Sequence, residues 1–291
     1  MIEHLETLVA LSRTGTMMET ATTLSISQSA VSKRIATLER HYDRKLIERQ
    51  GRRVVLTASG VRLVERVGPL VSELRSVFLE DNALRKGKII VGVSDAILAS
   101  WGPALFASVR EPGVELQFHA QRSPTVLDRI RAGEYMVGIC TGFSERETDV
   151  QSEVLHLEPM VIIPSGLTPL TYSTGQPLDV ITIESRSGAW ASIEDDLRRL
   201  RLQRATSLES FFAVAQMAVA GFGHGLVPAG VAETLQVPKS SLIVPDIDGL
   251  VRPVRFVARK SMFSRPLVQG FYAQLQGGLR ARQRRLRAWL G

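Results

Sequence analysis

The chain has 291 residues, of which 44% are hydrophobic and 22% charged, proportions typical of a globular protein with room for two domains. Its net charge of +7 is uneven: residues 1–87 carry 14 basic against 10 acidic residues, residues 88–279 carry 17 against 19, and residues 280–291 carry five arginines and no acid. The basic ends predict an anionic polymer as their partner, and the slightly acidic middle has a different task.

Cysteine content and hydropathy indicate the compartment. A single cysteine, Cys140, excludes a scaffold of intramolecular disulfides and fits a reducing environment. The opening MIEHLETLVAL carries Glu3 and Glu6 and no basic residue, unlike a signal peptide. The most apolar stretch, residues 211–232, is interrupted by a glutamine, a histidine, a proline and four glycines, which indicates buried helix, turn and strand. We therefore expect a cytoplasmic protein without a membrane partner.

Three short helices are predicted in the first 42 residues. Apolar residues at helical spacing predict a first helix that ends near Gly15, and a second helix spans residues 17–24. Ser27 is a favourable N-cap for a third helix, the run QSAVSKRIATLERHY. Two short helices joined by a tight turn, the second one capped, are typical of a helix-turn-helix.

The third predicted helix has two unlike faces. Val31, Ile35 and Leu38 recur at i, i+4 and i+7 and point inward, whereas the opposite face is small, polar and cationic. A recognition helix enters the major groove of DNA with its N-terminal residues near the base edges. The residues expected to contact DNA from this helix are Gln28, Ser29, Ser32, Lys33 and Arg34.

A two-stranded wing is predicted after this helix. Leu46 and Ile47 precede a turn centred on Gly51, and the β-prone run 54–56 follows. The arginines at the base and tip of the wing would reach phosphates or the minor groove. These are Arg49, Arg52 and Arg53. The alternative interpretation is a three-helix bundle whose basic face is only solvated.

Three stretches carry a family resemblance: ATTLSISQSAVSKRIATLE at 21–39, LIER at 46–49 and LTASG at 56–60. Together they closely resemble the winged helix-turn-helix of LysR-type transcriptional regulators. The chain departs from that pattern at Asp43, where the family usually has Gly, and at Ile47, where it usually has Phe.

The resemblance implies an N-terminal winged helix-turn-helix, mainly α, and a C-terminal α/β, two-lobed effector domain like that of periplasmic binding proteins. It places the domains at residues 1–58, 59–87 and 88–291. It also implies a regulator that binds double-stranded DNA and a small-molecule effector, with RNA polymerase as a further candidate partner.

A long helix is predicted after residue 57. Its apolar positions are spaced alternately by four and three residues, an a/d heptad seam that favours a partner helix. The seam consists of Leu63, Val67, Leu70, Leu74, Val77, Asp81 and Leu84. Pro69 would bend this helix. The alternative is packing on its own domain, but the resemblance favours a dimer or tetramer, and a two-fold dimer predicts an imperfectly palindromic operator.

Strand and helix signals alternate from residue 88 onward, which predicts a parallel sheet with helices on its faces. The expected strands lie near 88–93, 114–120, 136–140, 161–163, 179–183, 224–227, 242–244 and 254–258. A helix from Ser207 to Ala220 is predicted from the capping-box pair Thr206 and Glu209. The last helix spans about 265–289.

The layout of this region resembles the family's effector domain, with one lobe at 88–162 and 264–291 and the other at 163–263. The segment GFGHGLVP at 221–228 matches the family's G-x-G-x-x-x-x-P stretch.

Ligands of open α/β sheets bind beyond the carboxyl ends of the strands, where helix N-termini offer free N–H groups. Hydroxyl groups and one arginine in these loops predict a pocket for a small organic acid or other anion. The expected residues are Ser94, Ser100, Trp101, Arg122, Ser123, Thr141 and Ser187. Each of them taken singly has the alternative of an N-cap or turn residue.

Other chemistries have little support in the sequence. The five histidines show no metal-ligand spacing, and there is neither a G-x-S-x-G elbow nor a phosphate-binding glycine loop, so no enzyme, metal or cofactor is expected. Cys140 ends an apolar strand and is expected in the core. A solute-binding protein without an export signal is the rival function. The C-terminal arginines are either an auxiliary DNA contact or a solvated helix face.

Overall fold

A computed structural model describes residues 1–51, 53–142, 150–173, 176–184, 188–246 and 249–290. The chain divides into two compact units, which we call the first unit (Met1–Leu79) and the second unit (Glu80–Gly291). The long helix α4 (Ala58–Lys86) begins in the first unit. No helix in the described part of the chain is long and apolar enough to span a bilayer.

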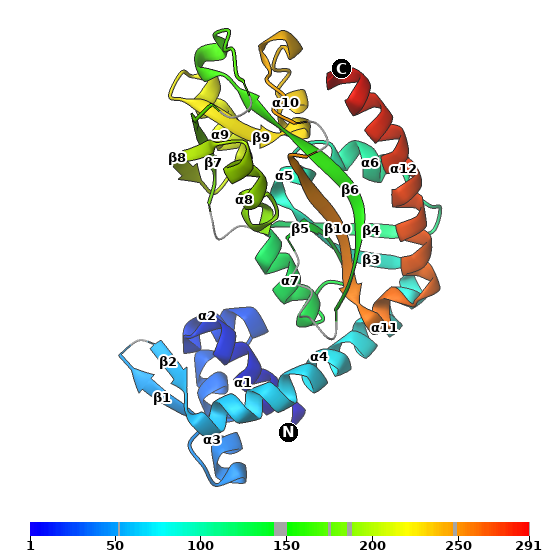
Figure 1. Cartoon of the computed structure of the whole chain (residues 1–291). Helices are drawn as coiled ribbons and strands as arrows, with labels where there is room; N and C mark the ends of the chain where they lie inside the picture. Colours follow the sequence, from blue (N-terminus) through cyan, green and yellow to red (C-terminus); the bar gives the residue numbers. More distant parts are fainter. Residues whose placement is uncertain (52, 143–149, 174–175, 185–187, 247–248, 291) are drawn as a thin grey trace. The chain divides into compact units, whose positions relative to one another are not determined.

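The first unit has the predicted winged helix-turn-helix fold (Figure 1). Its elements before α4 are α1 (Ile2–Thr14), α2 (Met17–Leu24), α3 (Gln28–Tyr42), β1 (Ile47–Gln50) and β2 (Arg53–Leu56). The Thr16 hydroxyl caps α2 by accepting a hydrogen bond from Glu19 N, and the Ser27 hydroxyl caps α3 by accepting one from Ala30 N, both at 3.1 Å. The capping residues therefore set the starts of both helices of the motif.

The core of the first unit confirms the predicted inward face of α3. Val31, Ile35 and Leu38 are buried and pack with Leu8 and Leu11 of α1. Strands β1 and β2 form an antiparallel hairpin around Gly51, whose φ of +63° is a conformation that glycine adopts without strain. The wing is attached to the helices because Val54 N donates to Gly15 O over 2.8 Å.

The predicted heptad seam of α4 splits into two parts. Leu63 is buried in the core of the first unit, and Val67 packs against the same core. In contrast, Leu70, Leu74 and Val77 are 59%, 42% and 51% exposed. The first part of the seam thus packs on its own domain, and the second part is an apolar stripe of the kind that a partner helix covers. The side chains of Asp81 and Leu84 lie outside the described part of the chain.

The second unit contains an eight-stranded mixed sheet in the order β4-β3-β5-β10-β6-β9-β7-β8. The strands are β3 (Lys88–Ser94), β4 (Glu115–Gln121), β5 (Val137–Thr141), β6 (Val150–Ile163), β7 (Leu178–Ile183), β8 (Leu202–Leu208), β9 (His224–Pro228) and β10 (Val251–Arg259). Strands β4, β3 and β5 are parallel to one another, as are β8, β7 and β9. The long strands β6 and β10 pair antiparallel between these halves (Figure 1).

Helices cover the sheet and divide its core. They are α5 (Asp95–Leu98), α6 (Gly102–Ser108), α7 (Ser123–Arg131), α8 (Gly188–Arg199), α9 (Phe211–Val219), α10 (Ala229–Thr234), α11 (Lys260–Phe263) and α12 (Pro266–Leu290). One core surrounds β3, β5 and the second part of β10, and another surrounds β7, β9 and the end of β6. Helix α12 contributes to both, with Leu275 in the first and Leu286 in the second.

Several expectations for the second unit need correction. We expected a helix from Ser207, but Thr206 belongs to β8 and α9 begins at Phe211, so Thr206 and Glu209 do not form a capping box. Residues 242–244 form only an isolated bridge between Ile243 and Ile162. We expected residues up to 263 in the second lobe, but residues 254–258 of β10 pair with β5 and pack in the first core. Helix α8 and strand β8 were not predicted.

Close packing between α4 and the wing explains the glycine of the LTASG segment (residues 56–60). Thr57 Oγ1 caps α4 by accepting from Gly60 N at 3.1 Å, and it donates to Lys45 O at 2.7 Å. This brings α4 so close to the wing that a Cβ on Gly60 would lie 2.0 Å from Leu46 O, whereas a Cβ on Gly68 of the same helix meets nothing within 4 Å.

We predict that Gly60→Ala lowers the stability of the first unit by about 1–3 kcal/mol, because a backbone oxygen must move. The matched variant Gly68→Ala should change stability by less than about 1 kcal/mol, because the helix preference of alanine is offset by the clash of its Cβ with the following Pro69. Thermal unfolding followed by far-ultraviolet circular dichroism measures both. Equal effects of the two substitutions would contradict the steric explanation.

Candidate functional site

The start of α3 presents polar side chains at the surface of the first unit. Gln28, Ser29 and Lys33 are exposed, and Ser32 is half-buried beside them. The Ser29 hydroxyl lies 2.8 Å from that of the N-cap Ser27, so it is oriented by the helix start. The opposite face of α3 is held in the core, and this surface is therefore a rigid platform with one cation and several hydrogen-bonding groups.

Arg34 differs from its neighbours on α3. Its guanidinium forms an ion pair with Glu3 and hydrogen-bonds Thr7 Oγ1 over 3.5 Å, and only 23% of its side chain is exposed. The DNA contact expected of Arg34 stays a prediction; in this structure its guanidinium contacts α1.

The wing is fixed to α3 by one carboxylate. Glu39 accepts hydrogen bonds from Leu46 N at 2.9 Å, from Ile47 N at 3.4 Å and from Lys45 Nζ at 2.9 Å. Burial alone would raise the pKa of Glu39, but these hydrogen bonds outweigh it and hold the pKa below its ordinary value of 4.5. Glu39 is thus ionised at neutral pH and orients the wing relative to the recognition helix.

The predicted arginines of the wing are only partly described. Arg53 is exposed at the first position of β2. The backbone of Arg49 belongs to β1, but its side chain and all of Arg52 lie outside the described part of the chain.

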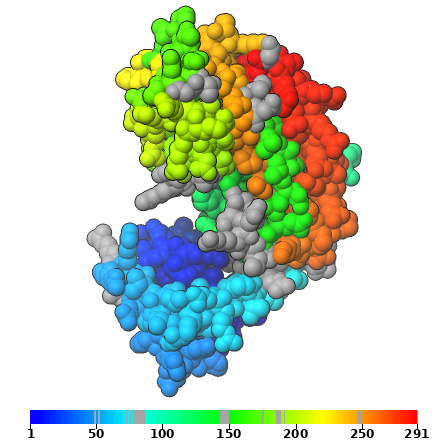
Figure 2. Space-filling model, viewed as in Figure 1, coloured from blue at the N-terminus to red at the C-terminus, as the bar shows by residue number. Residues whose placement is uncertain are grey.

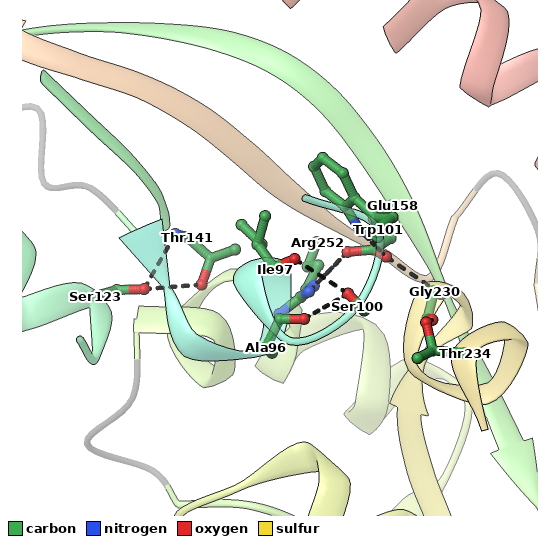
Figure 3. A network of polar contacts seen from close by, with 10 residues as sticks. All are labelled: Ala96, Ile97, Ser100, Trp101, Ser123, Thr141, Glu158, Gly230, Thr234 and Arg252. Atoms are coloured by element: carbon green, nitrogen blue, oxygen red, sulfur yellow. Dashed lines mark hydrogen bonds and ion pairs between the residues drawn. The ribbon is translucent and has the colours of Figure 1, made fainter. Parts of the chain in front are cut away.

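The second unit contains a cavity of about 420 Å³, which we call the cleft. Four of the predicted residues line it, namely Ser94, Arg122, Ser123 and Thr141. Ser123 Oγ accepts from Thr141 N at 3.1 Å and lies 3.2 Å from Thr141 Oγ1 (Figure 3). The carboxyl ends of β3 and β5 and the start of α7 therefore meet, as the parallel topology predicted.

Two glycines allow α7 to lie close to the sheet. A Cβ on Gly138 would lie 2.5 Å from Ile130 Cδ1 and 2.7 Å from Val126 Cγ1, and one on Gly92 would lie 3.1 Å from Val126 Cγ1. Glycines under α7 thus bring its first turn, with Ser123, to the end of β5.

Two predicted residues do not line the cleft. The Ser100 hydroxyl donates to Ala96 O at 2.5 Å and so bonds within its own turn. Trp101 is buried, and its Nε1 donates to Glu158 Oε1 at 2.9 Å. Ser187, a third predicted residue, lies outside the described residues.

The other wall of the cleft was mostly missed. It consists of Ile183, Glu184, Ala189, Glu209, Ser210, Phe211 and Arg252, and Asp95, Ala96 and Pro124 complete the first wall. Glu184 directly follows a strand that was predicted, so the same strand-end rule would have found it. Glu209, Ser210 and Phe211 were missed because their helix was placed four residues early.

Ionic groups from both walls meet in the cleft. Arg122 Nη1 lies 3.5 Å from Glu209 Oε1 and 3.9 Å from Glu184 Oε2. Arg122 is 62% exposed, so these ion pairs are weak and readily exchanged. The described lining has three carboxylates, those of Asp95, Glu184 and Glu209, against the guanidinium groups of Arg122 and Arg252.

Arg252 is not an ordinary cation of the cleft, because it is buried and already paired. Its Nε and Nη2 donate to Glu158 Oε2 at 2.9 and 2.7 Å (Figure 3). Its guanidinium also stacks on the ring of Phe211, 5.2 Å from the centroid. Burial alone would raise the pKa of Glu158, but Arg252 holds it below its ordinary value, so the pair is ionised.

The network continues into α12. Arg282 lies over the Trp101 ring at 5.1 Å and donates to Glu233 Oε2 at 3.0 Å. One member of the C-terminal arginine cluster is therefore buried. His156 packs edge-on to Trp101, and burial lowers the pKa of His156 to about 4, so its imidazole is neutral at neutral pH.

Family models match nearly the whole chain. Residues 2–67 match the model of the bacterial regulatory helix-turn-helix proteins of the lysR family, and residues 82–280 match the model of the LysR substrate binding domain. The chain belongs to the LysR family of transcriptional regulators. The expected fold class is thereby confirmed.

Individual relatives agree with this assignment. An uncharacterised HTH-type transcriptional regulator of Vibrio cholerae is 28% identical over 277 residues, covering 94% of this chain and 95% of that protein. A full-length variant of OxyR from Pseudomonas aeruginosa has a similar fold, with a TM-score of 0.66, 18% identity and coverage of 95% and 94%. CbnR in complex with its target DNA has a TM-score of 0.52 at 17% identity, with coverage of 96% and 99%.

The single cysteine lies in the core. Cys140 is 1% exposed in β5, and burial raises the pKa of its thiol to about 12. A thiol in this state is not an effective nucleophile at neutral pH. At 18% identity, the similarity to OxyR is a similarity of fold.

Proposed function

We propose that this LysR-family regulator reads DNA sequence with the start of α3 and responds to a small molecule bound in the cleft. The observation that carries the proposal is the exposed, capped start of α3 with Gln28 and Lys33, in the same chain as a cleft of about 420 Å³. The helix-turn-helix match favours this function over that of a solute-binding protein.

The polar residues of α3 divide by chemistry. Gln28, Ser29 and Ser32 offer hydrogen bonds without charge, which suits base edges in the major groove. Lys33 and Arg53 carry exposed charges that suit phosphates and supply affinity independent of sequence. Arg49 and Arg52 extend the phosphate-contacting set on the basis of their places in the wing sequence.

The exposed stripe of α4 supports assembly of two chains. Leu70, Leu74 and Val77 lie at heptad spacing and are each at least 42% exposed. Burying such a stripe against an identical helix removes apolar surface from water and produces a two-fold dimer. Two recognition helices would then read two half-sites of an imperfectly palindromic operator.

The charges of the cleft refine the expected class of effector. An anionic group fits beside Arg122, Ser123 and Thr141, at the N-terminus of α7. Glu184 and Glu209 on the other wall favour a cationic or hydrogen-donating group that takes the place of Arg122 in their weak ion pairs. The effector that satisfies both walls is a small zwitterion of the α-amino acid type rather than a simple organic acid.

We predict that Lys33→Ala weakens DNA binding to a similar extent on two duplexes, one selected from a random pool and one with that sequence scrambled. The slope of log affinity against log salt concentration should become smaller by about one. Gln28→Ala should instead reduce the preference for the selected duplex by roughly 1–3 kcal/mol. Fluorescence anisotropy at several salt concentrations measures both. Lys239, an exposed lysine of the second unit, provides the control Lys239→Ala. Equal losses of Lys33→Ala and Gln28→Ala on both duplexes would refute this division.

We predict that calorimetry with the twenty α-amino acids, a set of dicarboxylates and a set of diamines finds binding only among the amino acids. Ser123→Ala should weaken the best binder about tenfold, the value of a hydrogen bond to a charged group. The matched variant Ser100→Ala should leave affinity unchanged, since that hydroxyl bonds within its own turn. Binding of dicarboxylates alone, or equal losses in both serine variants, would reject the proposed class.

A further inference from the structure

A second cavity lies beside α12, between this helix and strands β6 and β10. Its volume is about 530 Å³, within the range of small-molecule sites in proteins. We call it the α12 cavity. Helix α12 (red) and β6 (green) lie side by side in Figures 1 and 2. This cavity is absent from the sequence predictions, which treated the C-terminal arginines as a DNA contact or a solvated face.

The cations of the α12 cavity come from one face of the helix. Arg280, Arg284 and Arg287 recur at i, i+4 and i+7 and all line it. Arg280 and Arg284 are exposed, and among the described residues neither has a carboxylate partner. No acidic residue occurs in the described lining. The α12 cavity is therefore cationic, in contrast to the cleft, where carboxylates outnumber guanidinium groups.

The remaining walls are largely apolar. Leu157, Pro159, Val251 and Leu286 line them together with the polar pair His156 and Gln283, and Leu157 is 51% exposed although it lies on a long sheet strand. A concave apolar surface with convergent cations suits a small organic anion. A nucleic-acid backbone has no need of the cavity, because it could bind the exposed Arg285 outside the cavity as well as the arginines that line it. The fitting ligand is a small molecule with a carboxylate or phosphate group on an apolar body.

The α12 cavity is separate from the cleft, although both lie on the same strands. Leu157, Pro159 and Val251 face the α12 cavity, whereas Glu158 and Arg252 between them form the buried pair that reaches the cleft. Successive side chains of a strand point to opposite faces. Leu157 and Pro159 therefore lie on the opposite face of β6 from Glu158, and no described residue lines both cavities. A ligand in the α12 cavity would thus contact the strands that hold the cleft together.

We propose that the α12 cavity is a second ligand site, specific for a small organic anion whose charged group is bound by Arg280 and Arg284. Phenyl phosphate and benzoate serve as probes of the full chain by calorimetry, with benzamide as the neutral analogue and inorganic phosphate as the anion without an apolar body. At millimolar concentrations we expect saturable binding of the two aromatic anions and none of benzamide.

Variants locate the site and separate it from its alternatives. Arg280→Gln with Arg284→Gln should weaken binding of the aromatic anions about tenfold or more. Arg285→Gln, a neighbouring exposed arginine outside the cavity, should have no effect, and neither should Ser123→Ala in the cleft. The proposal fails if neither anion binds, if Arg285→Gln weakens binding equally, or if the double variant lowers affinity for scrambled duplex DNA and not for the probes. The last result would assign these arginines to DNA.

Discussion

The carboxylate of Glu158 is the point at which the parts of the second unit meet. It accepts two hydrogen bonds from Arg252 on β10, one from Trp101 next to α6 and one of 3.3 Å from Gly230 N in α10. Glu158 and Arg252 are 0% and 1% exposed and 94 residues apart in sequence. Removing both charges from water is costly, and the pair is tolerated only because the register of β6 and β10 places all these donors around one carboxylate.

This constraint explains features that are distant from the ion pair. Gly230 must lack a side chain, because its Cβ would lie 2.6 Å from Glu158 Oε1 and 2.5 Å from Trp101 Cδ1. Phe211 begins α9 directly against the Arg252 guanidinium, which joins the core around β7 and β9 to the long strand β10. The cleft therefore has walls from both halves of the sheet, and one of its lining residues, Arg252, belongs to the buried ion pair. A ligand that pulls on Arg252 or separates Arg122 from its acidic partners changes how the halves are held, which gives effector binding a physical route to a conformational change.

The sequence predicts local features much better than long-range pairings. The cap at Ser27, the inward face of α3 and the turn at Gly51 follow from short-range rules, and the structure agrees with each. Strand β8 was missed because it is an edge strand with almost no buried residue, so that it lacks the apolar signal of its neighbours.

Within the cleft, residues that end parallel strands were predictable, and residues defined by distant partners were not. Ser123 and Thr141 follow from the strand-end rule, whereas Ser100 and Trp101 satisfy it and still point elsewhere, one into its own turn and the other to Glu158. Arg252 gives no local signal, because a charged residue inside a strand indicates a buried site only when its partner is known. The ionic character of the cleft, and hence the class of effector, depends on pairs of this kind.

A double-mutant cycle on Glu158 and Arg252 tests the central interaction most directly. All three tryptophans, Trp101, Trp190 and Trp289, belong to the second unit, so their fluorescence during chemical denaturation reports its unfolding. Glu158→Gln and Arg252→Gln should each cost about 3–5 kcal/mol, because each leaves one buried charge unpaired, and the double variant should be no less stable than either single variant. Costs that simply add in the double variant would show that the two residues act independently and would contradict this account.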